Sequence, residues 1–215
     1  MGRGRRVPSP ADDEEPPAEE FRVTSTAFTN GGKIPHKFTS DGHAPQTNLS
    51  PPIAWHNLPE GTESLAVIMV DVDAPDPRDP ISEWVHWVVY DIPPALKELP
   101  GGLNSKQAFN EGMYQEIKEG HNDFKVPGYI GPNPPPNGTH RYVIRVYALD
   151  QMMGKLGNKV SKDKLEAAME GHILAETEIV GTYSKEKFGP GRDAFVPPGR
   201  PQESGQGTPF PTKGA

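Results

Sequence analysis

The sequence predicts a mainly β (α+β) fold, an antiparallel two-sheet β sandwich with a few short peripheral helices. Proline makes up 26 of the 215 residues, more than twice the average usage of about 5%. Because proline interrupts helices, long helices are not expected and connecting loops should be plentiful. Four segments rich in β-branched and aromatic residues are instead bounded by Pro, Gly or Asp, which is typical of strands.

These four segments predict the core strands of the sandwich. They are Leu65–Val70, Trp84–Tyr90, Tyr142–Leu149 and Glu178–Tyr183. The first three are apolar on both faces, so they should be central strands that are covered on each side. Weaker patterns at Phe21–Phe28 and Pro52–Trp55 predict two further strands near sheet edges.

Helices are few in the predicted fold. One helix is predicted after Ser161, a residue type that caps helices, by residues at helical spacing. These are Leu165, Ala168, Met169, His172 and Ile173. A second, looser helix is predicted over Gln107–Lys118. Strands with few helices and long connections favour an antiparallel sandwich over a βαβ fold.

The chain divides into one domain with a tail at each end. Residues 1–20 hold four prolines and six carboxylates, a composition that cannot bury enough apolar surface to order itself. From about residue 189 to 215 the chain is again polar and rich in Pro and Gly. We therefore expect a disordered N-terminal tail over 1–20, one domain over 21–188 and a disordered C-terminal tail over 189–215.

Composition excludes several function classes. With no Cys, the chain has no disulfide, thiol nucleophile, Cys-ligated zinc or iron–sulfur cluster. A formal net charge of −7 makes nucleic acid a poor partner. The N-terminus lacks the apolar core of a signal peptide, and the longest apolar run, Leu65–Val70, is far short of a membrane span. A cytoplasmic protein with no transmembrane segment is expected.

The informative polar residues lie at the ends of predicted strands. Asp71 and Asp73 follow the first core strand, and period two places both carboxylates on one side. His86 lies within the second core strand and should share a face with Trp84 and Val88. His140 opens the third core strand after a loop over 131–138 whose prolines should hold it rigid.

Each of these residues also has a structural explanation. An Asp beside Pro is common in turns, and a buried His often only satisfies a hydrogen bond of the core. Two His and two Asp resemble a metal site, but no His-Glu-x-x-His or His-x-His pair fixes ligands, so metal is a minor alternative. Glu83 could be a general acid, although a solvated strand-edge carboxylate is the simpler interpretation. No nucleophile elbow, P-loop or dinucleotide motif occurs.

Four short blocks resemble the two signature motifs of the phosphatidylethanolamine-binding (Raf kinase inhibitor-like) family. They are Asp71–Pro75, Glu83–Trp87, Gly131–Pro135 and Gly138–Tyr142. The blocks occur in the family's order, which makes the resemblance specific. Segments Ser50–Trp55, Gly120–Phe124 and Glu170–Ala175 are similar to its bacterial and archaeal branch. The resemblance covers roughly Phe21–Tyr183 and leaves both tails unexplained.

The resemblance implies a β sandwich with a small pocket for phosphate-like anions, such as phospholipid headgroups or phosphorylated side chains, with no cofactor and no metal. The implied ligand-binding residues are Asp71, Ala74, Pro75, Trp84, His86, Gly131, Pro132, Asn133, His140 and Tyr142. One departure is Val72, where the family usually has proline. Val restores a backbone N–H and loosens φ, which makes the aim of Asp71 less certain.

The chemistry of such a pocket follows from its residue types. Two imidazoles, a tyrosine hydroxyl and the backbone N–H groups of a rigid loop can donate to a tetrahedral anion. Asp71 would repel an anion unless a proton lies between them or a histidine is cationic, which suits a monoprotonated phosphate or an ammonium-bearing headgroup. Asp73 should brace the loop against Arg141.

Three functions follow from these expectations. The first is a non-enzymatic protein that binds anions or phosphorylated ligands and regulates partners. The second is an inhibitor of a kinase or protease that acts through its protein surface. The third is a hydrolase with His86 or His140 as base, weakened by the lack of an activated nucleophile. The resemblance further implies a homodimer.

Overall fold

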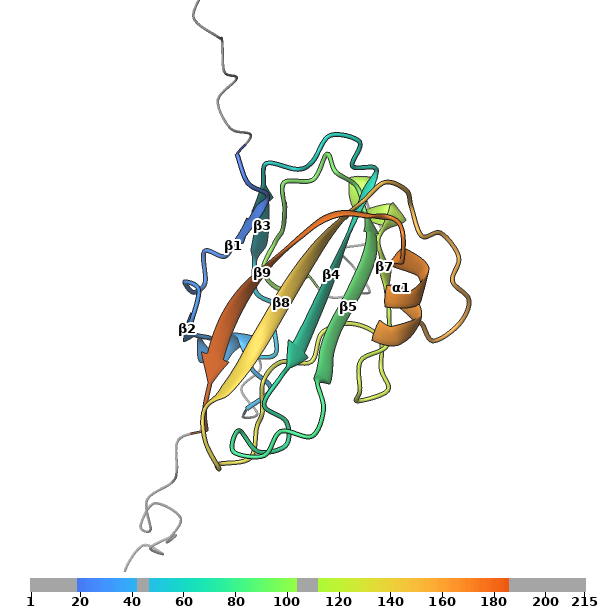
Figure 1. The fold of residues 1–215 in the computed structure, drawn as a ribbon. Helices are drawn as coiled ribbons and strands as arrows, with labels where there is room; N and C mark the ends of the chain where they lie inside the picture. The colour runs from blue at the N-terminus through green and yellow to red at the C-terminus, as the bar shows by residue number, and fades with distance from the viewer. Residues whose placement is uncertain (1–18, 42–46, 104–111, 186–215) are drawn as a thin grey trace, which may run out of the picture. The chain divides into compact units, whose positions relative to one another are not determined.

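The computed structural model describes residues 19–41, 47–103 and 112–185 (Figure 1). Nearly all of both predicted tails, and residues 107–111 of the looser helix predicted over 107–118, lie outside these ranges. Within them the chain forms two β-sheets and one α-helix. The predicted mainly β, two-sheet architecture is confirmed.

The larger sheet has six strands in the order β2-β9-β8-β4-β5-β7, and the smaller has three in the order β1-β3-β6. The larger sheet contains β2 (Gly32–Lys33), β4 (Ser64–Asp71), β5 (Trp84–Ile92), β7 (Lys118–Glu119), β8 (His140–Leu149) and β9 (Ile173–Tyr183). The smaller sheet contains β1 (Arg22–Thr24), β3 (Ile53–His56) and β6 (Glu98–Leu99). Every pair is antiparallel except β2 with β9, which is parallel.

Both faces of the larger sheet are covered, because its central strands are apolar on both sides. On one face, Val67 and Met69 of β4 pack in a common core with Trp55 of β3 and Leu99 of β6. On the other face, the outward residues of β4 form a second core with Leu165 of the helix α1 (Lys162–Met169). Figure 1 shows the small sheet and α1 on opposite sides of the large sheet. All eight residues of β4 are buried, including the six, Leu65–Val70, for which the sequence predicts cover on both faces.

The predicted helix after Ser161 is present but shorter. The Ser161 hydroxyl caps it by accepting a hydrogen bond from the Lys164 N–H at 3.3 Å. The helix ends at Met169, because Gly171 takes a left-handed conformation with φ of 81° that stops it. The prediction was therefore wrong for His172 and for Ile173, which begins β9.

Other element boundaries also differ from prediction, and β1 covers only Arg22–Thr24 of the predicted Phe21–Phe28 strand. Strand β9 is longer than the predicted Glu178–Tyr183 segment, because its pairing with β8 extends back to Ile173 opposite Leu149. In the described part of the looser predicted helix, residues Gly112–Glu116 form a 3-10 helix (η3) and Lys118 belongs to β7. A second 3-10 turn (η1) covers His36–Phe38.

A β-bulge near the start of β5 positions the candidate site. Val70 of β4 pairs with Val85, yet the preceding Met69 pairs with Trp87, so His86 is the extra residue of β5. A bulge redirects side chains that strict alternation would place elsewhere. The expected common face of His86 and Val88 is therefore wrong, since Val88 packs in the core beneath α1.

Candidate functional site

A pocket of about 200 Å³ opens at the end of the large sheet where β4 ends and β5 and β8 begin, the lower end of the sheet in Figure 1. Strand register explains how residues distant in sequence converge there. Asp71, the last residue of β4, pairs with Trp84 on one side and with Tyr142 on the other. The lining residues are Asp71, Ala74, Pro75, Trp84, His86, Phe124, Asn133, Pro134, Pro135, His140 and Tyr142.

Asp71 and His140 form a buried pair on the pocket floor. The Nδ1 atom of His140 lies 2.8 Å from Oδ2 of Asp71, and its Nε2 atom lies 3.2 Å from Oδ1 of Asn137. The Asn137 amide is oriented by its own N–H, which donates to the Pro75 carbonyl at 2.9 Å. Both ring nitrogens of His140 thus face oxygen acceptors, and only an imidazolium can donate to both. Such a cation would balance the charge of Asp71.

His86 makes a different set of contacts. Its Nδ1 atom lies 2.6 Å from the carbonyl oxygen of Ile130, an acceptor, so the ring carries a proton on Nδ1. Burial lowers the pKa of His86 below its ordinary value of 6.5, although the Ile130 contact and Asp71 oppose the shift. His86 is therefore neutral at pH 7, and Nε2 is the nitrogen left with a lone pair that can accept a proton from a ligand.

The Tyr142 hydroxyl is a buried donor at the same floor. The Asp71 carboxylate lies near it, but the two groups do not form a hydrogen bond of standard geometry. Burial raises the pKa of Tyr142, and the nearby Asp71 carboxylate raises it further, so the hydroxyl keeps its proton. The His86 and Tyr142 rings meet edge to face at a centroid distance of 5.2 Å. An unsatisfied buried hydroxyl costs free energy that a ligand acceptor could recover.

Asp73 and Arg141 brace the loop behind the floor. The Asp73 carboxylate accepts from the Arg141 backbone N–H at 2.8 Å and from its guanidinium at 2.9 and 2.7 Å. These hydrogen bonds lower the pKa of Asp73, with burial opposing the shift. The Val72 N–H, which the usual proline would lack, donates to the Arg141 carbonyl at 3.1 Å. Val72 therefore adds a further tie between the same two segments.

The pocket wall differs from the wall expected around residues 131–133. Asn133 lines the pocket, but Gly131 and Pro132 do not. The Gly131 N–H donates to Oδ1 of Asn48 at 2.7 Å, so it cannot serve a ligand in this conformation. A Cβ at Gly131 would lie 2.3 Å from the Phe38 carbonyl oxygen, so only glycine permits this close approach. Gly131 thus supports the wall from behind.

Phe124 is a wall residue that the sequence did not assign. It meets the Trp84 ring edge to face at 5.6 Å and the His86 ring at 5.7 Å. The sequence feature that could have identified Phe124 is the Gly120–Phe124 segment, which resembles the bacterial and archaeal branch of the family but carries no functional prediction. Asp123 fixes its position, because its Oδ2 atom accepts from the Val85 N–H at 2.8 Å.

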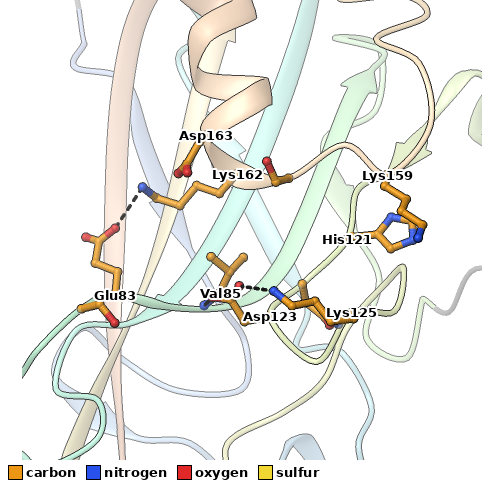
Figure 2. A pocket seen from close by; sticks show the side chains of 11 residues that line it. Glu83, Val85, His121, Asp123, Lys125, Lys159, Lys162 and Asp163 are labelled. Atoms are coloured by element: carbon orange, nitrogen blue, oxygen red, sulfur yellow. Dashed lines mark hydrogen bonds and ion pairs between the residues drawn. The ribbon is translucent and has the colours of Figure 1, made fainter.

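A second, larger pocket of about 620 Å³ lies between β5, the 121–125 loop and the start of α1 (Figure 2). Glu83 belongs to this pocket, where its carboxylate pairs with Lys162 at 3.2 Å and Arg145 at 3.1 Å. Burial would raise the pKa of Glu83, but these cations outweigh it and lower the pKa. Glu83 is therefore ionised and turned away from the first pocket, which does not suit a general acid there.

The described residues contain no group of three or more His, Cys, Asp or Glu side chains placed to hold a metal ion. The same residues include no helix of the length and apolarity needed to cross a membrane.

Comparison with known proteins agrees with this architecture. The family model of the phosphatidylethanolamine-binding protein matches residues 24–184. A UPF0098 protein of Methanothermobacter thermautotrophicus is 39% identical over 165 residues, 77% of this chain and 99% of the relative. A UPF0098 protein of Aquifex aeolicus is 41% identical over 77% of this chain and 90% of the relative.

Two solved structures extend the comparison. A phosphatidylethanolamine-binding protein homologue of Chlamydia trachomatis superposes with a TM-score of 0.65 at 33% identity, covering 77% of this chain and 98% of its own. E. coli YbcL superposes with a TM-score of 0.67 at 29% identity, covering 78% of this chain and 100% of its own. The chain belongs to the phosphatidylethanolamine-binding protein family, in its bacterial and archaeal branch.

Proposed function

We propose that this protein is a non-enzymatic receptor for small phosphate-bearing ligands, which it binds in the pocket at the end of β4, β5 and β8. The observation that carries the proposal is the buried Tyr142 hydroxyl beside the neutral ring of His86; the hydroxyl lies near the Asp71 carboxylate but makes no hydrogen bond of standard geometry with it. A phosphate oxygen that accepts from Tyr142 would satisfy the hydroxyl.

The charges of the floor suit a ligand with one negative charge and one proton. Asp71 faces His140, and the nearby guanidinium of Arg141 is already paired with Asp73. A phosphate dianion would find no unpaired cation among the lining residues. A monoanion instead can accept from Tyr142 and donate its proton to Nε2 of His86.

A hydrolase is the weaker alternative. The lining residues include the candidate bases His86 and His140, but none of them is Ser, Thr, Cys or Lys. Without any of these four nucleophiles, hydrolysis would require direct attack by a ring nitrogen or by the Asp71 carboxylate, or a water held by one of the rings. His86 already donates from Nδ1 and His140 faces acceptors on both sides, so His86 alone is suited to act as base.

Inhibition of a kinase or protease through the protein surface and a homodimeric state rest on family resemblance, and a cytoplasmic location rests on the composition of the sequence. Sedimentation at several concentrations tests the dimer, which a concentration-independent monomer would contradict.

Calorimetric titration with inorganic phosphate at pH 6 tests the proposal. We expect one site per chain, weakened at least tenfold in Tyr142→Phe and in His86→Ala, because each loses a hydrogen bond to a charged group worth about 1.5–3 kcal/mol. Lys97→Ala, outside both pockets, is the control and should bind as the parent does. Unchanged affinity in both pocket variants would refute the proposal, and turnover of a simple phosphate ester would favour the hydrolase.

A further inference from the structure

The larger pocket beside α1 is separate from the proposed phosphate site (Figure 2). The two pockets share no lining residue, and the 121–125 loop divides them, because Asp123 and Lys125 line the larger one while Phe124 lines the smaller one. The volume of about 620 Å³ would hold about twenty waters at about 30 Å³ each. This volume is ordinary for a small-molecule site. The pocket is therefore large enough for an organic ligand of its own.

The charges of this lining balance one another. Three lysines and three carboxylates line the pocket, namely Lys125, Lys159, Lys162, Glu83, Asp123 and Asp163. Lys162 pairs with Glu83 at 3.2 Å, and Lys125 pairs with Asp123 at 3.5 Å. Lys159 and Asp163 have no ion pair among the described residues. The pocket thus offers a ligand one cation and one anion, and its balanced charge does not favour a phosphate dianion.

The two unpaired charges lie on different sides of the pocket. Figure 2 shows Lys159 together with His121 on the right, and Asp163 with Glu83 further to the left. Asp163 belongs to the first turn of α1, whereas Lys159 lies before the N-cap residue of this helix. A ligand that reaches both must therefore carry opposite charges at its two ends.

Two lysines of the lining have an unusual backbone conformation. Five residues of the described chain other than glycine have a positive φ, and three of them are Asn or Asp, which adopt it most readily. The other two are Lys125 and Lys159, with φ of 65° and 53°. The Lys125 N–H donates to the Asn122 carbonyl at 3.0 Å, and the Val160 carbonyl, next to Lys159, accepts from the His121 N–H at 2.7 Å. Unfavourable conformations that tertiary contacts maintain concentrate at ligand sites, and here both occur around one cavity.

His121 adds a hydrogen-bonding group on the side of Lys159. Its Nδ1 atom is buried and has no hydrogen-bond partner among the described residues. Its backbone contact with Val160 keeps it next to the Lys159 segment. Nε2 is then the nitrogen of this ring that can donate to a ligand in the pocket. A carboxylate has two acceptor oxygens, so it can accept from Nε2 and from the Lys159 ammonium together.

We propose that this pocket binds a zwitterionic aminocarboxylate, whose ammonium and carboxylate groups lie at the two ends of a chain of several atoms. The carboxylate accepts from Lys159 and from Nε2 of His121, and the ammonium donates to Asp163. The linking chain crosses the pocket between them, past Val85 and the Ser161 hydroxyl, which also line it. An α-amino acid such as glycine carries both charges on neighbouring atoms and cannot reach both sides.

An amide-resolved NMR titration of the full chain at pH 7 tests the inference with four probes: triglycine, N-acetyl-triglycine, triglycine amide and glycine. We expect triglycine to give saturable shifts centred on His121, Ser161 and Asp163. The two blocked derivatives each lack one terminal charge, so each should bind about threefold more weakly than triglycine, as the loss of one exposed charge contact predicts. Glycine should bind more weakly still.

Substitutions assign the two ends of the ligand. Lys159→Ala should weaken the binding of triglycine about threefold but leave triglycine amide, which has no carboxylate, unchanged. His121→Phe keeps a ring of similar volume and should act in the same way. Asp163→Asn should weaken triglycine and leave N-acetyl-triglycine, which has no ammonium, unchanged. Lys155→Ala is the matched control, because Lys155 is an exposed lysine outside the pocket lining and its loss should change nothing.

A further probe, 6-aminohexanoate, distinguishes the source of the ligand, because it joins the same two end groups through a hydrocarbon chain. Tighter binding of triglycine would identify a short peptide, and equal or tighter binding of 6-aminohexanoate would identify a linear amino acid. In either case Lys159→Ala and Asp163→Asn must both weaken the probe that binds more tightly.

Three results would overturn the inference. They are the absence of saturable shifts around the larger pocket with triglycine and 6-aminohexanoate, equal affinity of triglycine and its blocked derivatives, and variants that weaken all probes to the same extent. Each can occur whether or not inorganic phosphate binds at the smaller pocket, so this inference and the proposed function fail separately.

Discussion

At the scale of single residues, the pocket depends on two histidines whose rings are fixed by different hydrogen-bond partners. His86 donates from Nδ1 to a backbone carbonyl and is neutral because burial lowers its pKa. His140 faces acceptors at both nitrogens. Nε2 of His86 is thus left free for the proton of the proposed ligand, whereas His140 is the partner of Asp71.

The neutral state of His86 predicts different pH dependences for a phosphate monoester and for sulfate, because the first anion titrates near neutrality and the second does not. A phosphate monoester loses its second proton near pH 6, so its affinity should fall as pH rises through about 6, when Nε2 of His86 no longer receives a proton. Sulfate does not titrate in this range and should bind weakly near neutrality. It should gain affinity only as pH falls below 6.5 toward the lowered pKa of His86. Calorimetry with both anions between pH 5 and 8 measures the two curves, and parallel curves would contradict this assignment.

Asp73 should stabilise the fold in a pH-dependent manner. Its pKa is lowered in the folded protein by Arg141, so its contribution is present above the unfolded value near 3.8 and is lost as pH falls through the folded value. We expect Asp73→Asn to lower the free energy of unfolding by about 1–2 kcal/mol at pH 7 and by progressively less below pH 4. Urea denaturation at both pH values measures this difference.

Asp76→Asn provides the comparison for that experiment. Arg78 lowers the pKa of Asp76 to about 2, but the pair is exposed to solvent, and exposed ion pairs contribute little. Its urea midpoint should move much less than that of Asp73→Asn. Equal effects of the two variants would show that the Asp73–Arg141 pair does not brace the loop.

At the scale of elements, the pocket depends on segments that approach one another closely behind its wall. Gly131 lies against the backbone of Phe38 and Thr39, and its N–H donates to Asn48. We expect Gly131→Ala to lower the free energy of unfolding by about 1–3 kcal/mol, because an overpacked backbone contact forces a shift.

Gly101→Ala serves as the control for Gly131→Ala. The nearest atom to a Cβ at Gly101 is a proline side-chain carbon at 3.3 Å, which can yield slightly. Thermal unfolding of both variants measures the difference. A Gly131→Ala protein as stable as Gly101→Ala would contradict the close approach.

The sequence predicted the elements better than their ends. Apolar segments with β-branched residues located β4, β5 and β8, because burial on both faces leaves a clear composition. The bulge at His86 was not predicted, since strict alternation of side chains assumes regular pairing. The end of α1 was overestimated because Ile173 continues the helical spacing, although pairing with β8 draws it into β9.

For the site, too, the sequence predicted the strand residues better than the contacts between loops. Asp71, Trp84, His86, His140 and Tyr142 were expected in one pocket, and the register of β4 with β5 and β8 brings them together. The exclusion of Gly131 and the inclusion of Phe124 depend on contacts between loops, which no local pattern encodes.

At the scale of the whole molecule, the family match over 24–184 falls within the predicted domain, and the tails stay a prediction of composition. We expect a chain cut to residues 19–185 to melt within about 2 °C of the full chain, because the removed sequences hold few apolar residues to bury. Differential scanning calorimetry of both chains checks this. A substantially lower melting temperature for the shorter chain would place part of the removed sequence in the folded domain.

The central claim is that phosphate binds at the floor formed by β4, β5 and β8 and not in the larger pocket beside α1. An amide-resolved NMR titration of the full chain with inorganic phosphate at pH 6 tests this most directly. The account predicts saturable shifts centred on Ala74, His86, Asn133 and Tyr142, which disappear in Tyr142→Phe. Shifts centred on Glu83, His121 and Asp163 around the larger pocket, or no saturable shifts, would contradict it.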